Sequence, residues 1–301
     1  MTRIATVPLQ RTLADAIQRN QEKLAVSQQQ LATGRKAADY AALGTETVRN
    51  LSAHGMIARQ DAFSAVGKRI GTTMAVYQNH LDALDDTMQS LRNAMLDAVG
   101  TGNAAGLQAG IEAAFNQFRA MLNADEGGVP LFAGGRTDTS PFSPETLSDA
   151  AAIPAEDAFR DGTVRATARV AEGVDVAYGI PAGSIGRDLY EAFRTLAQGG
   201  PIDGQVSAGQ GDTLRQAMDR IDAGLSVVRA ANAANGRKQA QVEDLSTRAE
   251  QRALVFQDVI ASNEDADLGQ VAVDLAQQQA MLQASYSVFA RISDLNLTQY
   301  L

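Results

Sequence analysis

Ser184 lies in the sequence Ala182-Gly183-Ser184-Ile185-Gly186, which differs from the G-x-S-x-G pattern of a hydrolase nucleophile only at its first position. In such enzymes a histidine further along the chain takes the proton of the serine hydroxyl. Here both histidines, His54 and His80, precede Ser184. The sequence therefore argues against a serine hydrolase, and we expect both histidines to be exposed on helices.

Three acids, Glu264, Asp265 and Asp267, form the densest group of possible metal ligands, but they lack the glycine and the ligand spacing of a calcium loop. The segment from Ser262 to Asp265 has the S-x-x-[DE] form of a capping box, which favours the start of a helix. Gly209 and Gly211 lack the preceding strand and the third glycine of a nucleotide loop. We therefore expect no catalytic, metal-binding or cofactor-binding residues.

The composition excludes further classes of function. The 301 residues include no Cys, which rules out disulfides, thiolate metal sites and cysteine nucleophiles. The net charge of −9 argues against binding to nucleic acid or anionic lipid. No apolar run approaches the ~18 residues that cross a bilayer, and no ordinary secretory signal is visible. We expect neither a nucleic-acid partner nor membrane insertion, and most enzyme classes are disfavoured.

The first element is predicted to be a helix that ends near Gly34. Its apolar positions repeat at coiled-coil spacing, and they are Leu13, Ile17, Leu24 and Leu31. Residues 36–45 then form a connection.

The strongest periodic pattern lies between residues 46 and 99. Two seven-residue rows, offset by four, form an a/d seam: Phe63, Ile70, Tyr77, Leu84 and Leu91, with Met74, Leu81, Met88 and Met95. A helix of this length would span roughly 80 Å at 1.5 Å per residue, against an average of ~11 residues in globular proteins. Gly67 and Gly71 either mark a close helix–helix approach or weaken the start of the helix.

The middle of the chain changes character. A third helix is predicted over about 104–124, with one apolar face made of Leu107, Ile111, Phe115, Phe118 and Leu122. From 127 to 186 the heptads stop, and five of the seven prolines occur here. Thr163–Val170 and Val174–Ile180 are predicted to be short strands joined by a turn at Glu172–Gly173.

The C-terminal half mirrors the N-terminal half. A short helix over Asp188–Ala197 precedes a long one that begins at Asp212 as N-cap and continues to about 260. The last helix is apolar on more sides than one partner can cover, so it needs several neighbours in water. The subunit interface is predicted at Leu13, Ile17, Leu24, Leu31, Leu268, Val271, Leu275, Met281, Leu282, Val288, Phe289, Ile292 and Leu295.

The two ends of the chain carry opposite charge. Residues 1–36 contain six basic and two acidic residues, a net +4, whereas residues 241–301 contain three basic and nine acidic residues, a net −6. Opposite signs favour contact between the ends, within one chain or between chains.

Three stretches resemble the bacterial flagellin family, most closely the hook-associated proteins of the hook–filament junction. "LAVSQQQLATGRKAADY" (24–40) is similar to the family's N-terminal helix. Residues 264–301, which begin "EDADLGQVAVDLAQQQAMLQASYSVFARI" and end in Tyr-Leu, are similar to its C-terminal helix. "LFAGGRTDTSPF" (131–142) resembles a motif typical of the junction protein, carried by Leu131, Phe132, Ala133, Gly134, Thr137, Thr139, Pro141 and Phe142. The Asn-Asp-Gly element of filament flagellins is missing around 60–75, which favours the junction protein.

The resemblance implies a structural subunit, not a catalyst. Such proteins are exported by the flagellar type III apparatus and held beforehand by a chaperone. They assemble outside the cell as a ring of copies between the other hook-associated junction protein and flagellin.

The expected fold is mainly α: a long antiparallel helical bundle or coiled-coil rod built from both chain ends, with a small β-containing insertion. Residues 1–42 with 264–301 would form the terminal core domain, residues 43–135 with 187–263 the long-helix domain, and residues 136–186 the outer insertion. Two alternatives are a divergent filament flagellin and a cytoplasmic coiled-coil scaffold or signalling module.

Overall fold

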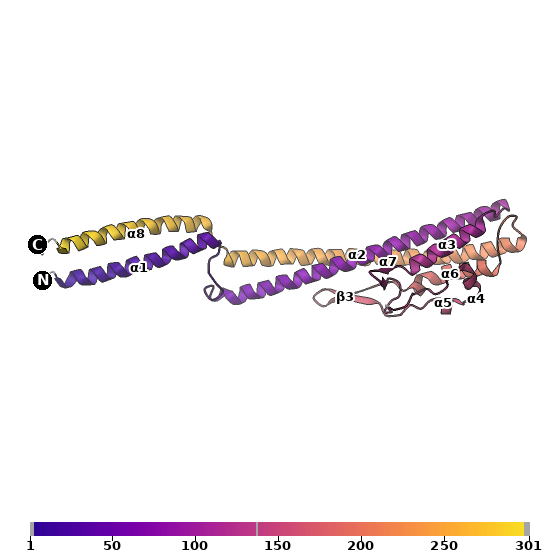
Figure 1. Ribbon diagram of the computed structural model, residues 1–301, viewed down its shortest axis with the longest axis horizontal. Coiled ribbons are helices and arrows are strands. Elements are labelled where there is room, and N and C mark those ends of the chain that lie inside the picture. Colours follow the sequence, from indigo (N-terminus) through magenta and orange to yellow (C-terminus); the bar gives the residue numbers. More distant parts are fainter. Residues whose placement is uncertain (1–2, 137, 298–301) are drawn as a thin grey trace. The chain divides into compact units, whose positions relative to one another are not determined.

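The computed structural model describes residues 3–136 and 138–297, with side chains for residues 8, 11–136 and 138–291. Eight helices and four short strands follow one another in this part of the chain: α1 (Arg3–Thr33), α2 (Glu46–Thr101), α3 (Leu107–Leu122), β1 (Asp125–Glu126), β2 (Val129–Pro130), α4 (Leu147–Ala152), α5 (Ala155–Ala158), β3 (Ala166–Ala171), β4 (Val174–Tyr178), α6 (Ala182–Gln198), α7 (Ala208–Glu264) and α8 (Leu268–Leu297) (Figure 1).

The chain forms two compact units. The first contains residues 1–59 and 252–301, and the second contains residues 60–251. The first unit therefore combines the two ends of the chain, whereas the second is one continuous segment, and the long helices α2 and α7 each contribute residues to both units. The mainly helical fold with a small β-containing insertion is confirmed, since the strands form only two antiparallel pairs, β1–β2 and β3–β4.

The predicted a/d seam of α2 is the core of the second unit. From Ile70 to Met95 every seam residue is at most 5% exposed, and only Phe63, at its start, is half-buried. Opposite lie buried residues of α7: Leu214, Met218, Ile221, Leu225 and Val228. The seven-residue spacing keeps these rows on one side of each helix, so the two helices bury them together.

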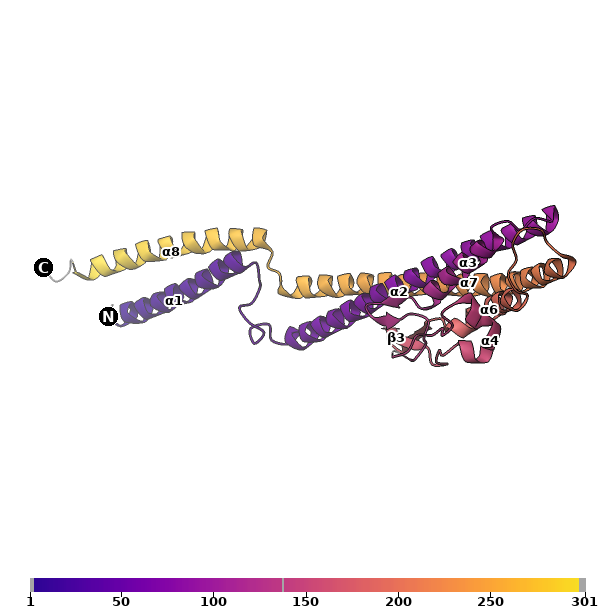
Figure 2. The same cartoon turned by 45° about the vertical axis from the view of Figure 1, so that its right-hand side comes forward.

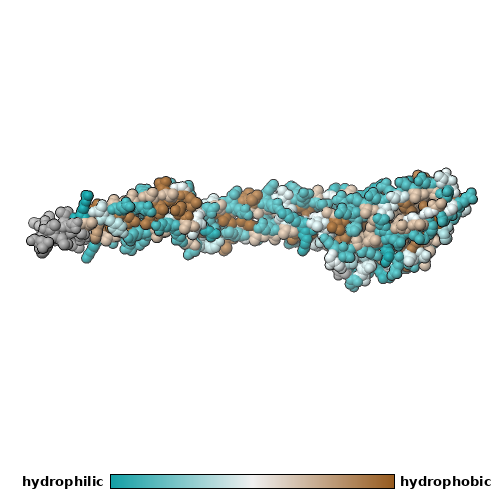
Figure 3. All heavy atoms as spheres, turned by 45° about the horizontal axis from the view of Figure 1, so that its top comes forward, coloured by the Kyte–Doolittle hydropathy of each residue, from teal (hydrophilic) through white to brown (hydrophobic). Residues whose placement is uncertain are grey.

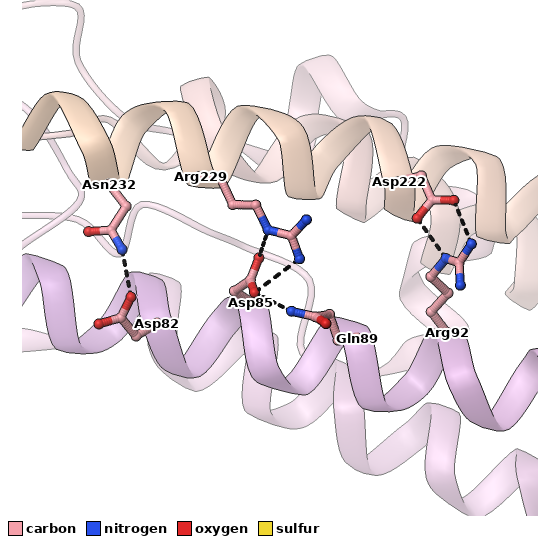
Figure 4. A network of polar contacts seen from close by, with 7 residues as sticks. All are labelled: Asp82, Asp85, Gln89, Arg92, Asp222, Arg229 and Asn232. Atoms are coloured by element: carbon pink, nitrogen blue, oxygen red, sulfur yellow. Dashed lines mark hydrogen bonds and ion pairs between the residues drawn. The ribbon is translucent and has the colours of Figure 1, made fainter.

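Polar side chains beside this seam fix the alignment of α2 and α7 (Figure 4). Arg92 of α2 makes two hydrogen bonds with Asp222 of α7, at 2.6 and 3.0 Å. Arg229 of α7 makes two with Asp85 of α2, at 2.7 and 3.2 Å. The donor and the acceptor thus change sides between the two contacts, and a shift by one turn would break both pairs. Since such exposed ion pairs add little stability, their effect is on register, while the apolar seam supplies the stability.

The remaining helices of the second unit enclose an aromatic cluster. The predicted face of α3 is buried, from Leu107 to Leu122. The Phe115 ring meets Phe193 of α6 edge-on at 5.3 Å, and Phe142 lies 5.3 Å from Tyr190. The helix predicted at Asp188–Ala197 begins earlier, because α6 starts directly after Pro181. Ser184 lies in its first turn, and the Ser184 hydroxyl donates to the Pro181 carbonyl at 2.6 Å.

The predicted strand pair is confirmed as the hairpin β3–β4, which turns at Gly173 with φ of 67°. Its buried residues Val170 and Val176 pack with Ile70 and Met74 of α2 and with Val242 of α7. The hairpin thereby covers Ile70 and Met74 of α2 beside Val242 of α7. A Cβ at Gly67 would stand 3.2 Å from the Ser246 Cβ, which favours the close-approach interpretation there, whereas Gly71 faces open space.

Two predicted helix starts are wrong. Asp212 is not an N-cap, because α7 begins four residues earlier, where the Ser207 hydroxyl and the Gln210 side chain cap each other's backbone. Ser262 does not start a helix either, since its hydroxyl donates to the Val259 carbonyl within α7, which continues to Glu264. Asp267 instead caps α8, accepting from the backbone N–H of Gly269 and Gln270 at 3.0 and 3.1 Å.

The motif at 131–142 attaches the insertion to the helices. Leu131, Phe132, Ala133, Pro141 and Phe142 are buried, Gly134 and Thr139 are half-buried, and Thr137 lies outside the described residues.

Hydrogen bonds between side chains and the backbone of the motif hold it in place. The Tyr77 hydroxyl of α2 donates to the Leu131 carbonyl. The Asn123 side chain makes two hydrogen bonds with the backbone of Phe142, at 2.9 and 3.0 Å. The burial of the Tyr77 hydroxyl raises its pKa to about 12. The motif is therefore a packing element of the second unit.

Gly134 is required at its position for two reasons. Its φ of 63° is the left-handed conformation, and a Cβ would stand 2.3 Å from the Gly162 carbonyl oxygen. Gly173 has a similar φ of 67° but open space around it. A comparison of the two glycines therefore separates the cost of the left-handed backbone from the cost of the steric clash. We predict that Gly134→Ala lowers the free energy of unfolding by about 3 kcal/mol or more, against about 1 kcal/mol for Gly173→Ala. Urea unfolding followed by circular dichroism measures both, and equal losses would show that the close approach to Gly162 is unimportant.

Candidate assembly surface

The helices α1 and α8 lie side by side and antiparallel in the first unit (Figures 1 and 2). The Gln21 side chain of α1 donates to the Tyr286 hydroxyl of α8 at 2.6 Å. Lys36, which follows α1, contacts the Ser262 carbonyl of α7. The predicted contact between the two ends of the chain is therefore present within one molecule.

The predicted interface residues fall into three groups. Val271 and Leu282 are buried, at 7% exposed, and Leu13, Ile17, Leu24 and Leu275 are half-buried. The others that can be placed are exposed: Leu31 (43%), Leu268 (47%), Met281 (45%), Val288 (46%) and Phe289 (37%). The side chains of Ile292 and Leu295 lie outside the described residues. One row thus packs α1 against α8, and a second faces away from the pair.

Sequence reasoning missed further exposed apolar residues in the same unit. They include Val26 on α1, Val273 on α8, Val48 and Leu51 at the start of α2, and Leu254 and Val255 near the end of α7, with exposures from 51% to 74%. On the face shown in Figure 3, hydrophobic side chains gather along the terminal helix pair. The three-residue spacing of Val48 and Leu51 was an available signal, but these residues precede the seam that starts at Phe63.

The energy available from this surface can be estimated. A large apolar side chain contributes about 1.5–3 kcal/mol when fully buried, so one that is already half-covered has about 1 kcal/mol left to gain. Association itself costs about 4–15 kcal/mol. One or two such residues cannot offset that cost, whereas the whole set, covered at once by several neighbours, can. Contiguous uncovered apolar residues of this kind mark interaction surfaces.

Charge does not join the two terminal helices. The basic residues Arg11, Arg19 and Lys23 are exposed, and no ion pair links the side chains described in 11–33 with those in 268–291. Among the acids of the C-terminal segment, Asp244 pairs with Arg248 and Glu250 with Lys68. The expectation that opposite net charge would set the pairing is therefore not met by direct contacts within the chain.

The connections α1–α2 and α7–α8 are instead joined through their backbones. Lys36 N–H donates to the Glu264 carbonyl at 2.7 Å, and Ala266 N–H donates to the Gly34 carbonyl at 2.8 Å. These bonds enclose an antiparallel bridge between Arg35 and Asp265. Gly34 has a φ of 70°, the left-handed conformation that ends α1 and turns its carbonyl to this contact.

A buried carboxylate stands beside this joint. Glu264 is 8% exposed, and its Oε1 accepts a hydrogen bond from the Nδ2 of fully buried Asn50 at 2.8 Å. Asn263 Nδ2 donates to Asn50 Oδ1 at 3.0 Å, and His54 Nε2 lies 3.4 Å from Glu264 Oε1. Because a buried carboxylate without donors is costly, this network favours the one arrangement of α2 and α7 in which Asn50 reaches Glu264.

The two histidines that were considered for chemistry make different, unrelated contacts. His54 contacts Glu264, but His80 was expected to be exposed and is half-buried, with its ring edge-on to Phe132 at 6.1 Å. Burial lowers the pKa of the His80 imidazole. Among the described residues, no three His, Asp or Glu side chains are arranged to hold a metal ion. No helix within the described ranges has the length and apolarity of a membrane span.

Comparison with known proteins gives a structural likeness. No family model and no curated protein sequence matches the chain. Among the solved structures that share its fold are the following two. One, a protein described as a flagellar hook-associated protein from Vibrio parahaemolyticus, has a TM-score of 0.58 and 16% sequence identity, covering 73% of this chain and 97% of that one. The other, FlgL from Bacillus cereus, has a TM-score of 0.56 and 11% identity, covering 70% and 98%. The fold thus agrees with the predicted resemblance over nearly the full length of those two proteins and over 70–73% of this chain.

The Asn50–Glu264 contact can be tested through the tryptic sites Arg35 and Lys36 in the joint. We predict that Asn50→Ala raises the rate of tryptic cleavage there about tenfold, because leaving Glu264 without its donor costs about 1–3 kcal/mol. Ser52→Ala, an exposed neighbour on α2, should change nothing. The double variant Asn50→Leu, Glu264→Met should recover part of the protection, since neither polar group is then left unsatisfied. Cleavage of Asn50→Ala at the wild-type rate would show that the Asn50–Glu264 contact does not stabilise the joint.

Proposed function

We propose that this chain is a structural subunit of the bacterial flagellum: a hook-associated protein that joins hook to filament and assembles through its terminal helices. The observation that carries the proposal is the match of its fold to two flagellar proteins over nearly their whole length. The uncovered apolar residues of α1 and α8 support the mode of assembly.

The partners follow from this role. Copies of the chain would form a ring, with the other hook-associated junction protein on one side and flagellin on the other. An export chaperone would cover the C-terminal helix beforehand, because that helix carries exposed Met281, Val288 and Phe289. The protein would leave the cell through the type III apparatus and act outside it, without enzymatic activity.

In this proposal each of the three predicted domains has its own place in the assembly. Residues 1–42 with 264–301 would make contacts at the centre of the assembly, residues 43–135 with 187–263 would surround them, and residues 136–186 would lie outermost. A divergent filament flagellin would share this plan. The missing Asn-Asp-Gly element around 60–75 favours the junction protein.

The position of the protein in the flagellum tests the proposed function. In flagella sheared from the native organism, we expect antibodies against the chain to label only the boundary between hook and filament. Labelling along the filament would indicate a flagellin instead. Absence from flagella, with the protein retained in the cytoplasm, would favour the scaffold or signalling module and contradict the proposal.

Charged substitutions test the mode of assembly. We predict that Met281→Glu with Val288→Glu lowers incorporation into flagella at least about tenfold, because burying an unpaired carboxylate costs several kcal/mol. Both residues are exposed in the single chain, so helical content should stay unchanged. Because the proposed chaperone covers the same residues, incorporation is measured per molecule secreted. The control, Gln277→Glu with Gln279→Glu, places the same charges at exposed polar positions of α8 and should incorporate normally. Incorporation of the first variant at the wild-type level would contradict assembly through this face.

A further inference from the structure

A small pocket lies between the β3–β4 hairpin and α7, within the second unit. Its volume is about 90 Å³, and its polar lining residues are Arg165, Tyr178, Ser184, Asn235 and Lys238. Arg165 directly precedes β3, Tyr178 ends β4, Ser184 is in the first turn of α6, and the other two project from α7. The pocket has room for several water molecules or for one small oxyanion.

Two of these residues are cations that face each other without an acid. Lys238 is half-buried, and its Nζ donates to the Ala177 carbonyl at 2.7 Å, which leaves two of its three N–H donors unused. Burial and the neighbouring positive charge of Arg165 both lower the pKa of Lys238. No residue that lines the pocket is acidic, and among the described residues Arg165 has no hydrogen bond or ion pair.

This arrangement differs from that of other arginines in the same unit. Arg169, on the same hairpin, pairs with Asp175 at 2.8 Å, and Arg92 and Arg229 pair with Asp222 and Asp85. The whole chain carries 35 acidic residues and a net charge of −9. Two neighbouring cations with no carboxylate among the lining residues repel each other, and bringing them together is unfavourable unless an anion joins them.

We propose that this pocket binds one oxyanion group, a carboxylate or a phosphate, between the Arg165 guanidinium and the Lys238 ammonium. A guanidinium offers parallel N–H donors that match two oxygens of such a group, and the ammonium supplies a further charged donor. Tyr178 also lines the pocket, and a tyrosine hydroxyl can donate a third hydrogen bond. The first turn of α6 adds the partial positive charge of a helix N-terminus. Asp161, which accepts from Gly183 N–H in that turn at 3.1 Å, does not line the pocket.

The oxyanion can be a free ion or an acidic group on another protein molecule, and the chemistry of recognition is the same. The test uses the full chain, labelled with ¹⁵N, titrated at constant ionic strength with inorganic phosphate in one series and with acetate in another. We expect saturable shifts of the backbone N–H resonances of residues 165, 178–180 and 238. Saturation with acetate assigns the site to carboxylates, including acidic side chains, and saturation with phosphate alone assigns it to phosphate groups.

Variants identify the side chains responsible. Arg165→Gln and Lys238→Gln should each weaken the saturable binding at least tenfold. The matched control is Arg237→Gln, because Arg237 is exposed on the same turn of α7 and does not line the pocket. Unchanged resonances of the hairpin residues 167–176 show that each variant keeps its fold. Unsaturable shifts with both anions, or saturable shifts that persist in Arg165→Gln, overturn the proposal.

Discussion

The structure depends on how much of each long helix a neighbour can cover. In the second unit, the α2 seam from Ile70 to Met95 is at most 5% exposed, because α7, the small helices and the β3–β4 hairpin together surround it. In the first unit α8 has α1 beside it, and only Val271 and Leu282 are buried among its described side chains. Both helices carry apolar residues on several sides. The difference is that other elements of the same chain cover α2 on several sides, whereas among the described residues only α1 lies beside α8.

The middle segment of the chain therefore has a structural role. Residues 107–198 contribute the aromatic cluster of Phe115, Phe142, Phe193 and Tyr190 and the valines of the hairpin, which together complete the core of the second unit. The motif at 131–142 makes this possible, because Gly134 lets the backbone approach Gly162 and Phe142 is held by Asn123. Among the described residues the terminal helices have no equivalent covering segment, and neighbouring molecules would provide their cover in an assembly.

Polar contacts in both units determine alignment, while apolar contacts supply the stability. The reciprocal pairs Arg92–Asp222 and Arg229–Asp85 prevent α2 and α7 from sliding. Asn50 and Glu264 do the same within the first unit, beside the bridge that joins Arg35 to Asp265. The helices are thus fixed in register before any partner binds, which lowers the ordering cost of assembly.

Periodic features could be predicted from the sequence, and features that depend on single long-range contacts could not. The seven-residue rows of α2 predicted a buried seam, and two short strands joined by a turn at Glu172–Gly173 predicted the hairpin. Helix starts were wrong at Asp212 and Ser262, because Ser207 and Asp267 cap equally well and sequence does not say which cap is used. The Asn50–Glu264 contact spans 214 positions, and no local pattern marks it. The terminal apolar stripe was visible, but only the structure separates the row that packs α1 against α8 from the row that faces away.

Hydrogen exchange of the terminal helices, before and after assembly, tests the central claim most directly. In the free protein, the backbone N–H groups of α8 between residues 268 and 291 should exchange far faster than those of α2 between residues 74 and 95. In sheared flagella the exchange of the α8 groups should slow at least about a hundredfold, as expected when helices gain about 3 kcal/mol from new neighbours. Equal protection of both helices in the free protein, with no change on assembly, would contradict the account.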